Sequence, residues 1–202
     1  MIKISLALAA AYLLGAIPFG YLLVKLTTGT DVRVAGSGNI GATNVLRTAG
    51  RAAGAATLLL DIAKGYAAVW LAGRLTGGDP LWQSLAALTV MAGHAYPVFL
   101  AFRGGKAVAS CVGAFLCLAP LPLAAILVVW VVTVAATRYV SLGSILAAGL
   151  LPLSVWLISH PPVSVIASAG VAGVFIIWRH RANLARLRAG DEHKLSLGGG
   201  AG

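Results

Sequence analysis

The sequence predicts an all-α protein: a polytopic integral membrane helix bundle of seven transmembrane helices, with the N-terminus outside and the C-terminus in the cytoplasm. Of its 202 residues, 59% are hydrophobic and 10% are charged, far from the composition of a soluble domain. The apolar residues form runs of about 20, which is long enough to cross a bilayer. Most Lys and Arg residues fall in loops that this topology places on one side of the membrane.

The apolar runs give the candidate spans in order, and each is read as a helix because lipid offers no partners for backbone polar groups. The second run contains Asp61 and Lys64, three residues apart, which we expect to pair on one helical face. The runs cover residues 4–24, 52–73, 81–102, 107–137, 140–159 and 162–178.

The run 107–137 decides the number of spans, since Pro120 and Pro122 interrupt it. Read as two short helices that turn at these prolines, it gives seven spans and places 12 of the 15 Lys and Arg residues on the cytoplasmic face. Read as one helix, it gives six spans and separates the basic C-terminal segment from the first two loops. Positive-inside weighting therefore favours seven.

We expect a single membrane-embedded catalytic domain over 1–197, followed at 198–202 by a short glycine-rich tail that is flexible or a cloning remnant. The first run resembles a signal peptide, but its length and the spans that follow predict that it is retained. Cys111 and Cys117 lie in one apolar run and are expected to be small buried side chains. The net charge of +10 lines one membrane face and would attract anionic lipid or anionic substrates.

The first polar cluster, Gly36-Ser37-Gly38-Asn39-Ile40-Gly41, fits the dinucleotide fingerprint G-x-G-x-x-G, with Asp61 at the expected distance. That motif needs a preceding strand, whereas a membrane helix precedes it here, so the context argues against a Rossmann dinucleotide site. Its glycines instead suit a backbone nest for an anion. A helix that begins near Thr43 would point its N-terminus at the same anion. The guanidinium of Arg47 can donate two parallel hydrogen bonds to a phosphate.

The second cluster contains Gly104-Gly105-Lys106. A P-loop would need Gly at position 100 and Ser or Thr at position 107, where the sequence has Leu100 and Ala107, so Walker A is excluded. What remains is a glycine turn that presents a lysine near a helix start. Lys106 is then either an anion ligand or a snorkelling anchor.

The third cluster, "WRHRANLARLRAGDEHK", predicts an amphipathic cytoplasmic helix after the last span. His180, Asn183 and Leu187 share one face at spacings of three and four residues. Arg179, Arg186 and Arg188 are expected to reach other faces and lipid headgroups. His180 is either an interfacial residue or a group that donates a hydrogen bond or moves a proton.

Four segments together resemble the acyl-phosphate:glycerol-3-phosphate acyltransferase (PlsY) family over nearly the whole chain: "GSGNIGATNVLR", "LLLDIAKG", "GHAYPVFLAFRGGKAVAS" and "RHRANLARLRAGDEHK". The resemblance implies a bacterial inner-membrane enzyme of phospholipid synthesis with its active site at the cytoplasmic face. Such an enzyme transfers an acyl group from acyl phosphate to the sn-1 hydroxyl of glycerol 3-phosphate, and its products are lysophosphatidic acid and phosphate. The family pattern reads Gly-Gly-Lys-Gly, so Ala107 departs from it, which should be tolerated unless a positive φ is required.

The resemblance also implies roles for individual residues. The catalytic group would be Ser37, Lys106, His180 and Asn183. The substrate-binding group would be Arg47, Gly38, Asn39, Gly41, Thr43, Asn44, Gly104, Gly105 and Glu192. Glycerol 3-phosphate would meet the serine, arginine and lysine, and the glycine-rich loop would cradle the acyl phosphate. We expect acyl phosphate, glycerol 3-phosphate and membrane lipid as partners, no nucleic acid, and no cofactor or metal. The sequence leaves the oligomeric state open and is compatible with a monomer.

Acyl phosphate is a mixed anhydride with a good leaving group, so the reaction needs positioning and charge neutralisation more than a strong base. The glycerol hydroxyl would lose its proton to the donor's own phosphate, with His180 as the alternative base. No His in the chain is followed five residues later by Asp, which argues against the acyltransferases that use that motif. Two other classes stay open: a transporter or channel for a phosphorylated anion, and a lipid-binding scaffold.

Overall fold

The computed structural model describes residues 1–195, so the tail expected at 198–202 lies outside the described residues. Every regular element within that part of the chain is helical. The elements are α1 (Ile2–Ala16), α2 (Phe19–Thr28), η1 (Val32–Val34), α3 (Ala42–Thr76), α4 (Pro80–Ala95), η2 (Val98–Leu100), α5 (Val108–Leu118), α6 (Pro120–Thr137), α7 (Val140–Ser159), α8 (Val163–Arg179) and α9 (Arg181–Ala189).

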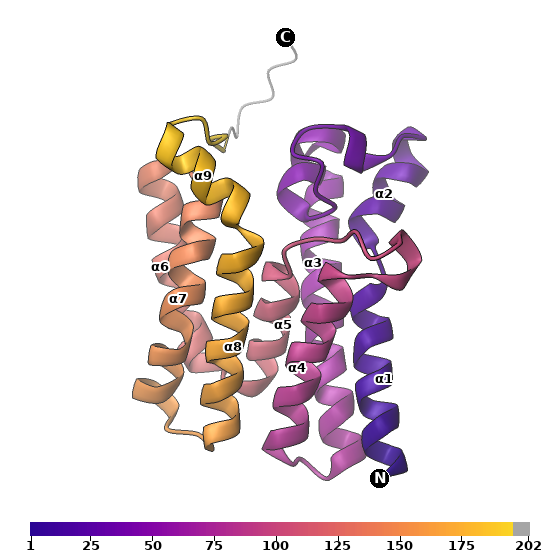
Figure 1. Cartoon of the computed structure of the whole chain (residues 1–202), viewed down its shortest axis with the longest axis vertical. Helices are drawn as coiled ribbons and strands as arrows, with labels where there is room; N and C mark the ends of the chain where they lie inside the picture. Colours follow the sequence, from indigo (N-terminus) through magenta and orange to yellow (C-terminus); the bar gives the residue numbers. More distant parts are fainter. Residues whose placement is uncertain (196–202) are drawn as a thin grey trace.

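The long helices run roughly along one axis and form two neighbouring groups (Figure 1). In one group α1 packs on α3 and α4, and α5 packs on α3; in the other α7 lies between α6 and α8. The contact of α4 with α8 joins the groups. α2, α9, the loop before α3 and the α4–α5 connection lie toward one end of the bundle, and the N-terminus lies at the other (Figure 1).

Among the described residues, four helical segments are long and apolar enough to cross a membrane: Ile2–Thr28, Ala42–Thr76, Pro120–Thr137 and Val140–Ser159. A fifth results if α8 and α9, which are bent by 55°, count as one broken span. The apolar helix α5 has only 11 residues. The fold is therefore an all-helical membrane bundle, and the expected seven spans and their direction stay a prediction.

The first apolar run contains a break that the sequence analysis did not predict. α1 ends at Ala16 and α2 begins at Phe19, because Pro18 has no N–H to donate and disfavours a helical conformation at Ile17. The freed carbonyl of Ile17 accepts a 2.8 Å hydrogen bond from Lys64.

The same lysine forms the buried ion pair expected on α3. Lys64 Nζ lies 2.9 Å from the Asp61 carboxylate, and both side chains are 2% exposed. His94 of α4 lies 3.7 Å from the same carboxylate. The predicted pairing is confirmed, and it joins three helices: α3 carries the charges, the break after α1 supplies a carbonyl, and α4 supplies an imidazole.

Other boundaries also differ from the apolar runs. α3 begins at Ala42, close to the helix start expected near Thr43, and bends at Gly50, whose φ is +87°. α4 ends at Ala95 rather than near 102, because Pro97 follows and cannot continue the helix. The run 107–137 does divide into two helices, α5 and α6, at Ala119.

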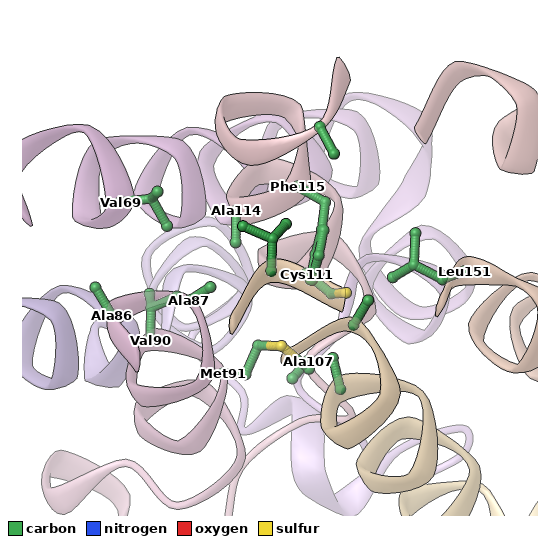
Figure 2. Close-up of a cluster of buried hydrophobic side chains, with 14 of the residues drawn as sticks. Val69, Ala86, Ala87, Val90, Met91, Ala107, Cys111, Ala114, Phe115 and Leu151 are labelled. Atoms are coloured by element: carbon green, nitrogen blue, oxygen red, sulfur yellow. The ribbon is translucent and has the colours of Figure 1, made fainter. Parts of the chain in front are cut away.

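The core consists mainly of small side chains that let the helices approach closely. Figure 2 shows Val69 of α3 and Ala86, Ala87, Val90 and Met91 of α4 beside Cys111 and Phe115 of α5. Where α3 crosses α5, a Cβ on Gly65 would collide with the Ser110 carbonyl and one on Gly113 with the Ile62 carbonyl. Membrane helices gain their association from such close packing rather than from a hydrophobic driving force.

Candidate active site

A cavity of about 330 Å³ lies between α3, α5, α6, α7 and the α8–α9 junction. One end is polar and basic, with Ser37, Arg47, Lys106 and Asn183 in its wall. The remaining wall is mostly apolar, with Asp61, His94 and Ser144 as polar members, and extends between the helices as far as Leu151. The cavity therefore joins a site for a charged group to a chamber for a hydrocarbon.

Three helices begin at this cavity. The first residues of α3, α5 and α7, which are Ala42, Val108 and Val140, all line it. The first amides of a helix have no intrahelical acceptor, and the helix dipole makes that end positive. Three such ends around one cavity, together with the basic side chains, produce a strongly anion-attracting site.

The loop before α3 takes its shape from Asn44, which is buried at the start of that helix. Its Oδ1 accepts a 2.8 Å hydrogen bond from the Ser37 amide. Its Nδ2 donates to the carbonyls of Val32, Ala35 and Asn39 at 2.9–3.1 Å. The Asn44 amide is thus fully used within the protein, and it holds the loop in place.

The glycines of this loop have separate tasks. Gly36 and Gly38 have φ of +58° and +68°, values that glycine adopts without steric cost. Gly41 is the N-cap of α3 and lines the cavity, whereas Gly38 is not part of the wall. The cavity wall also contains the remaining substrate-site candidates of this loop and of the start of α3, which are Ser37, Asn39, Thr43, Asn44 and Arg47.

The second and third clusters meet although 77 residues separate them. Lys106 Nζ donates a 2.6 Å hydrogen bond to Asn183 Oδ1, and Asn183 Nδ2 donates a 2.6 Å hydrogen bond to the Glu192 carboxylate. Glu192 also accepts hydrogen bonds of 2.8 Å from Ser141 and Arg186. The carboxylate therefore orients the amide, and the amide orients the ammonium.

These contacts influence the charge states of Lys106 and Glu192, the two ionisable side chains that Asn183 connects. Burial lowers the pKa of Lys106 to about 8; Glu192 opposes this, while Arg186, Arg179 and Arg47 add to it. Burial acts to raise the pKa of Glu192, but the hydrogen bonds from its three partners outweigh it and hold that pKa below its ordinary value. At neutral pH the site therefore holds an ammonium beside an ionised carboxylate.

His180 is buried at the junction of α8 and α9 and lines the cavity. Its Nδ1 lies 2.8 Å from the Ile176 carbonyl. Because a carbonyl can only accept, Nδ1 carries the hydrogen in this contact, which leaves Nε2 with the lone pair. His180 is thus able to accept a proton or a hydrogen bond through Nε2.

Gly104 and Gly105 do not line the cavity. Their amides donate 3.1 Å hydrogen bonds to the carbonyls of Ala95 and His94, so these N–H groups already have acceptors within the protein. The two glycines shape the turn before Lys106. Ala107, the N-cap of α5, has a φ of +62°, so the positive φ that would make its methyl group costly is present.

Several contributors were missed or misplaced by the sequence analysis. Arg179 and Arg186, expected to face lipid headgroups, instead turn inward: Arg179 onto the Gly104–Gly105 turn and Arg186 onto Glu192. Ser141 and Ser144 of α7 also line the cavity. Isolated serines in an apolar run carry no distinctive signal, and only the fold brings α7 to the site.

The apolar part of the cavity is lined by side chains of α3, α5, α6, α7 and α8. On α6 the lining side chains are spaced by three and four residues and form one face: Leu123, Ile126, Leu127 and Trp130. α3 contributes Leu58 and Ile62. Leu58 and Leu127 are 44% and 37% exposed, so the chamber reaches the lipid-facing side of the bundle. Across residues 1–195, no cluster of three His, Cys, Asp or Glu side chains is placed to hold a metal.

An all-helical membrane bundle with this cavity defines a class: an integral membrane protein whose cavity joins a basic, polar end to an apolar chamber. The family model for glycerol-3-phosphate acyltransferase matches residues 5–190. A glycerol-3-phosphate acyltransferase of Desulforamulus reducens is 48% identical and covers 92% of each chain. One of Geobacter sulfurreducens is 46% identical and covers 92% of this chain and 94% of its own. The chain belongs to the glycerol-3-phosphate acyltransferase family.

Solved structures agree in fold. The crystal structure of PlsY (YgiH), an integral membrane glycerol 3-phosphate acyltransferase, in its glycerol 3-phosphate form has a TM-score of 0.90 and 39% identity over 96% of both chains. The lysophosphatidic acid form of PlsY has a TM-score of 0.88 and 37% identity. The predicted family is confirmed, and the protein is a membrane acyltransferase of phospholipid synthesis.

Proposed function

We propose that this enzyme transfers a fatty acyl group from acyl phosphate to the sn-1 hydroxyl of glycerol 3-phosphate, giving lysophosphatidic acid and phosphate. The observation that carries the proposal is the continuity of the cavity, whose three helix N-termini and basic side chains open directly into an apolar chamber. Two phosphate-bearing substrates fit the polar end, and the acyl chain of the donor fits the chamber.

In this proposal Ser37, Arg47 and Lys106 hold glycerol 3-phosphate. His180 and Asn183 complete that pocket, with Glu192 fixing the amide. The donor's phosphate lies at the start of α3, against Asn39, Gly41, Thr43 and the loop that Gly38 and Asn44 shape. Gly104 and Gly105 act by placing the lysine. The proposed assignment of catalysis to Ser37, Lys106, His180 and Asn183 is supported by the presence of all four in the cavity wall.

The chemistry is a single acyl transfer. The glycerol hydroxyl oxygen attacks the carbonyl carbon of the acyl phosphate, and the bond from that carbon to the phosphate oxygen breaks. The phosphate leaves with the bonding electrons and takes the hydroxyl proton, so the donor supplies its own base. The protein's cations and helix ends neutralise the charge that develops on the leaving phosphate. His180 Nε2 is the alternative acceptor for the proton.

The donor is tested with purified protein in lipid bilayers, supplied with labelled glycerol 3-phosphate and one donor at a time. We expect lysophosphatidic acid with acyl phosphate and none with acyl-CoA or acyl carrier protein. A K106A variant serves as the matched control for the site. Formation of lysophosphatidic acid with acyl-CoA but not with acyl phosphate would overturn the proposed donor. Vesicle uptake of glycerol 3-phosphate without any product would favour the transporter or channel instead.

We further propose that the chain crosses the bacterial inner membrane seven times, with the N-terminus outside and the site at the cytoplasmic face. α2, the loop before α3, the α4–α5 connection and α9 lie toward one end of the bundle (Figure 1). They carry seven of the 15 Lys and Arg residues, which supports this orientation. A single cysteine at position 140, in a C111A/C117A background, should be labelled from the cytoplasm. Labelling from the periplasm would contradict the orientation.

A further inference from the structure

Arg179, the last residue of α8, makes a set of contacts for which the proposed reaction has no direct use. Its guanidinium donates to the Gly105 carbonyl at 2.8 and 3.2 Å and to the Gly104 carbonyl at 3.1 Å. These two glycines directly precede Lys106. The planar fork of an arginine can hold two carbonyls at once, which the point charge of a lysine cannot do in the same way.

The turn is held from its other side by the end of α4. The amides of Gly104 and Gly105 donate to the carbonyls of Ala95 and His94, each at 3.1 Å. The His94 ring lies against Gly105 so closely that a Cβ there would overlap Nε2. All four backbone polar groups of the two glycines therefore have partners, and Arg179 supplies the partners of both carbonyls.

Aromatic rings in turn place the guanidinium. Its central carbon lies 5.3 Å from the ring centroid of Tyr96 and 5.9 Å from that of Trp178, within the range of cation–π attraction. Phe175 contacts both rings, with centroid separations of 6.3 and 6.2 Å. The arginine therefore contacts aromatic rings at the ends of α4 and α8 as well as the turn.

We propose that Arg179 is a positioning residue: by holding the carbonyls of Gly104 and Gly105, it sets where the Lys106 ammonium stands relative to Asn183 and to the substrate phosphate. Arg179 is absent from the cavity wall, so it acts through the turn and not by touching substrate. The inference rests on the proposed function, in which Lys106 binds glycerol 3-phosphate.

The test uses purified full-length R179A and R179K, with R181A as the matched control. Arg181 is exposed and lies 4.7 Å over the same Trp178 ring. Misplacing a binding group by about 1 Å costs up to roughly 100-fold. We therefore expect R179A and R179K to lower kcat/KM for glycerol 3-phosphate by about 10- to 100-fold. R181A should stay within about twofold of the unmodified enzyme, as surface substitutions do.

A pH profile separates positioning from general damage. The charged and titratable groups that face Lys106 are Arg47 from α3, Arg179 and His180 from α8 and its end, and Arg186 and Glu192 from α9 and beyond. R179A removes one neighbouring cation, so the fall in kcat/KM at high pH should move to higher pH. R179K keeps the charge, so its profile should keep the shape of the unmodified enzyme at a lower level. Normal kcat/KM in R179K would overturn the inference.

A second measurement needs no substrate. Hydrogen–deuterium exchange in a peptide that spans 103–109 should be faster in R179A and unchanged in R181A, because the turn loses its carbonyl partners. Unchanged exchange in R179A would overturn the inference. If the unmodified protein makes no product from acyl phosphate, the proposed donor fails, while the exchange experiment still decides whether Arg179 fixes the turn.

Discussion

The Lys106 ammonium donates a 2.6 Å hydrogen bond to the side-chain oxygen of Asn183. This contact joins the α4–α5 connection to α9, and the Asn183 amide continues it to Glu192 at 2.6 Å. An ammonium fixed in this way presents its remaining donors to the cavity. The contact therefore links the two polar clusters that the sequence places far apart.

Replacing Asn183 should uncouple the ammonium from the carboxylate. In N183A, Lys106 and Glu192 both lose a hydrogen-bond partner, and we expect lysophosphatidic acid production to fall about 100-fold, as when one preorganised donor is removed. Initial rates at saturating substrate check this. R188A, which removes an exposed residue of the same helix, is the control. Near-normal turnover in N183A would contradict a positioned ammonium.

The charge of Lys106 predicts a pH dependence. Its pKa is lowered from 10.5 to about 8, and the ammonium is the form that binds phosphate. The value of kcat/KM for glycerol 3-phosphate should hold at neutral pH and fall as the pH rises through about 8. In K106R the guanidinium stays charged, so the residual activity should show no such fall. An identical fall in K106R would assign it to another group.

The same lowered pKa of Lys106 makes the stability of the fold rise with pH over the range in which the activity falls. The unfolded chain binds its proton more tightly than the folded one, so the buried ammonium costs stability below pH 8, and this cost declines as the pH rises from about 8 toward 10.5.

Ala107 should be better replaced by glycine. Its φ of +62° lies in the left-handed region, which costs a residue with a Cβ about 1–2 kcal/mol. We expect A107G to raise the melting temperature, with a gain of about 1 kcal/mol, and to keep its activity. A185G, an exposed position inside α9, should lower stability by about 1 kcal/mol. A lower melting temperature in A107G would show that the methyl group is well accommodated.

The buried pair of Asp61 and Lys64 predicts a non-additive pair of variants. K64M leaves a buried carboxylate without its 2.9 Å partner and should cost about 3–5 kcal/mol of stability. D61N/K64M removes both charges and should be more stable than K64M alone. Thermal unfolding of the three proteins in one detergent measures this. Equal loss in K64M and in the double variant would mean that the charge pairing is unimportant.

His180 provides a test of the proton acceptor. If the donor phosphate takes the proton, H180A loses only a substrate contact, and turnover should fall about tenfold. Removal of a general base typically costs 100- to 10,000-fold. Single-turnover rates with acyl phosphate distinguish the two. A loss within the larger range would assign the proton to His180.

Much of the site is readable from sequence because short polar motifs in an apolar chain have few other uses. The helix start near Thr43 is confirmed, and Gly41, Thr43 and Arg47 line the cavity, while their substrate-binding roles stay a prediction. The break at Pro18 was missed because hydropathy averages over a single proline. The inward turn of Arg179 was missed because a basic residue at a helix end has the same pattern whether it faces lipid or a neighbouring carbonyl.

The sequence by itself determined the membrane bundle, the pairing of Asp61 with Lys64, and the family, since these follow from local composition, helical periodicity and contiguous motifs. Only the tertiary structure decided which groups stay available for substrate. Asn44 and the amides of Gly104 and Gly105 bond within the protein, whereas the starts of three separate helices meet at one cavity. The reason is physical: a hydrogen bond made inside the fold removes a donor from the site, and only packing decides where each donor points.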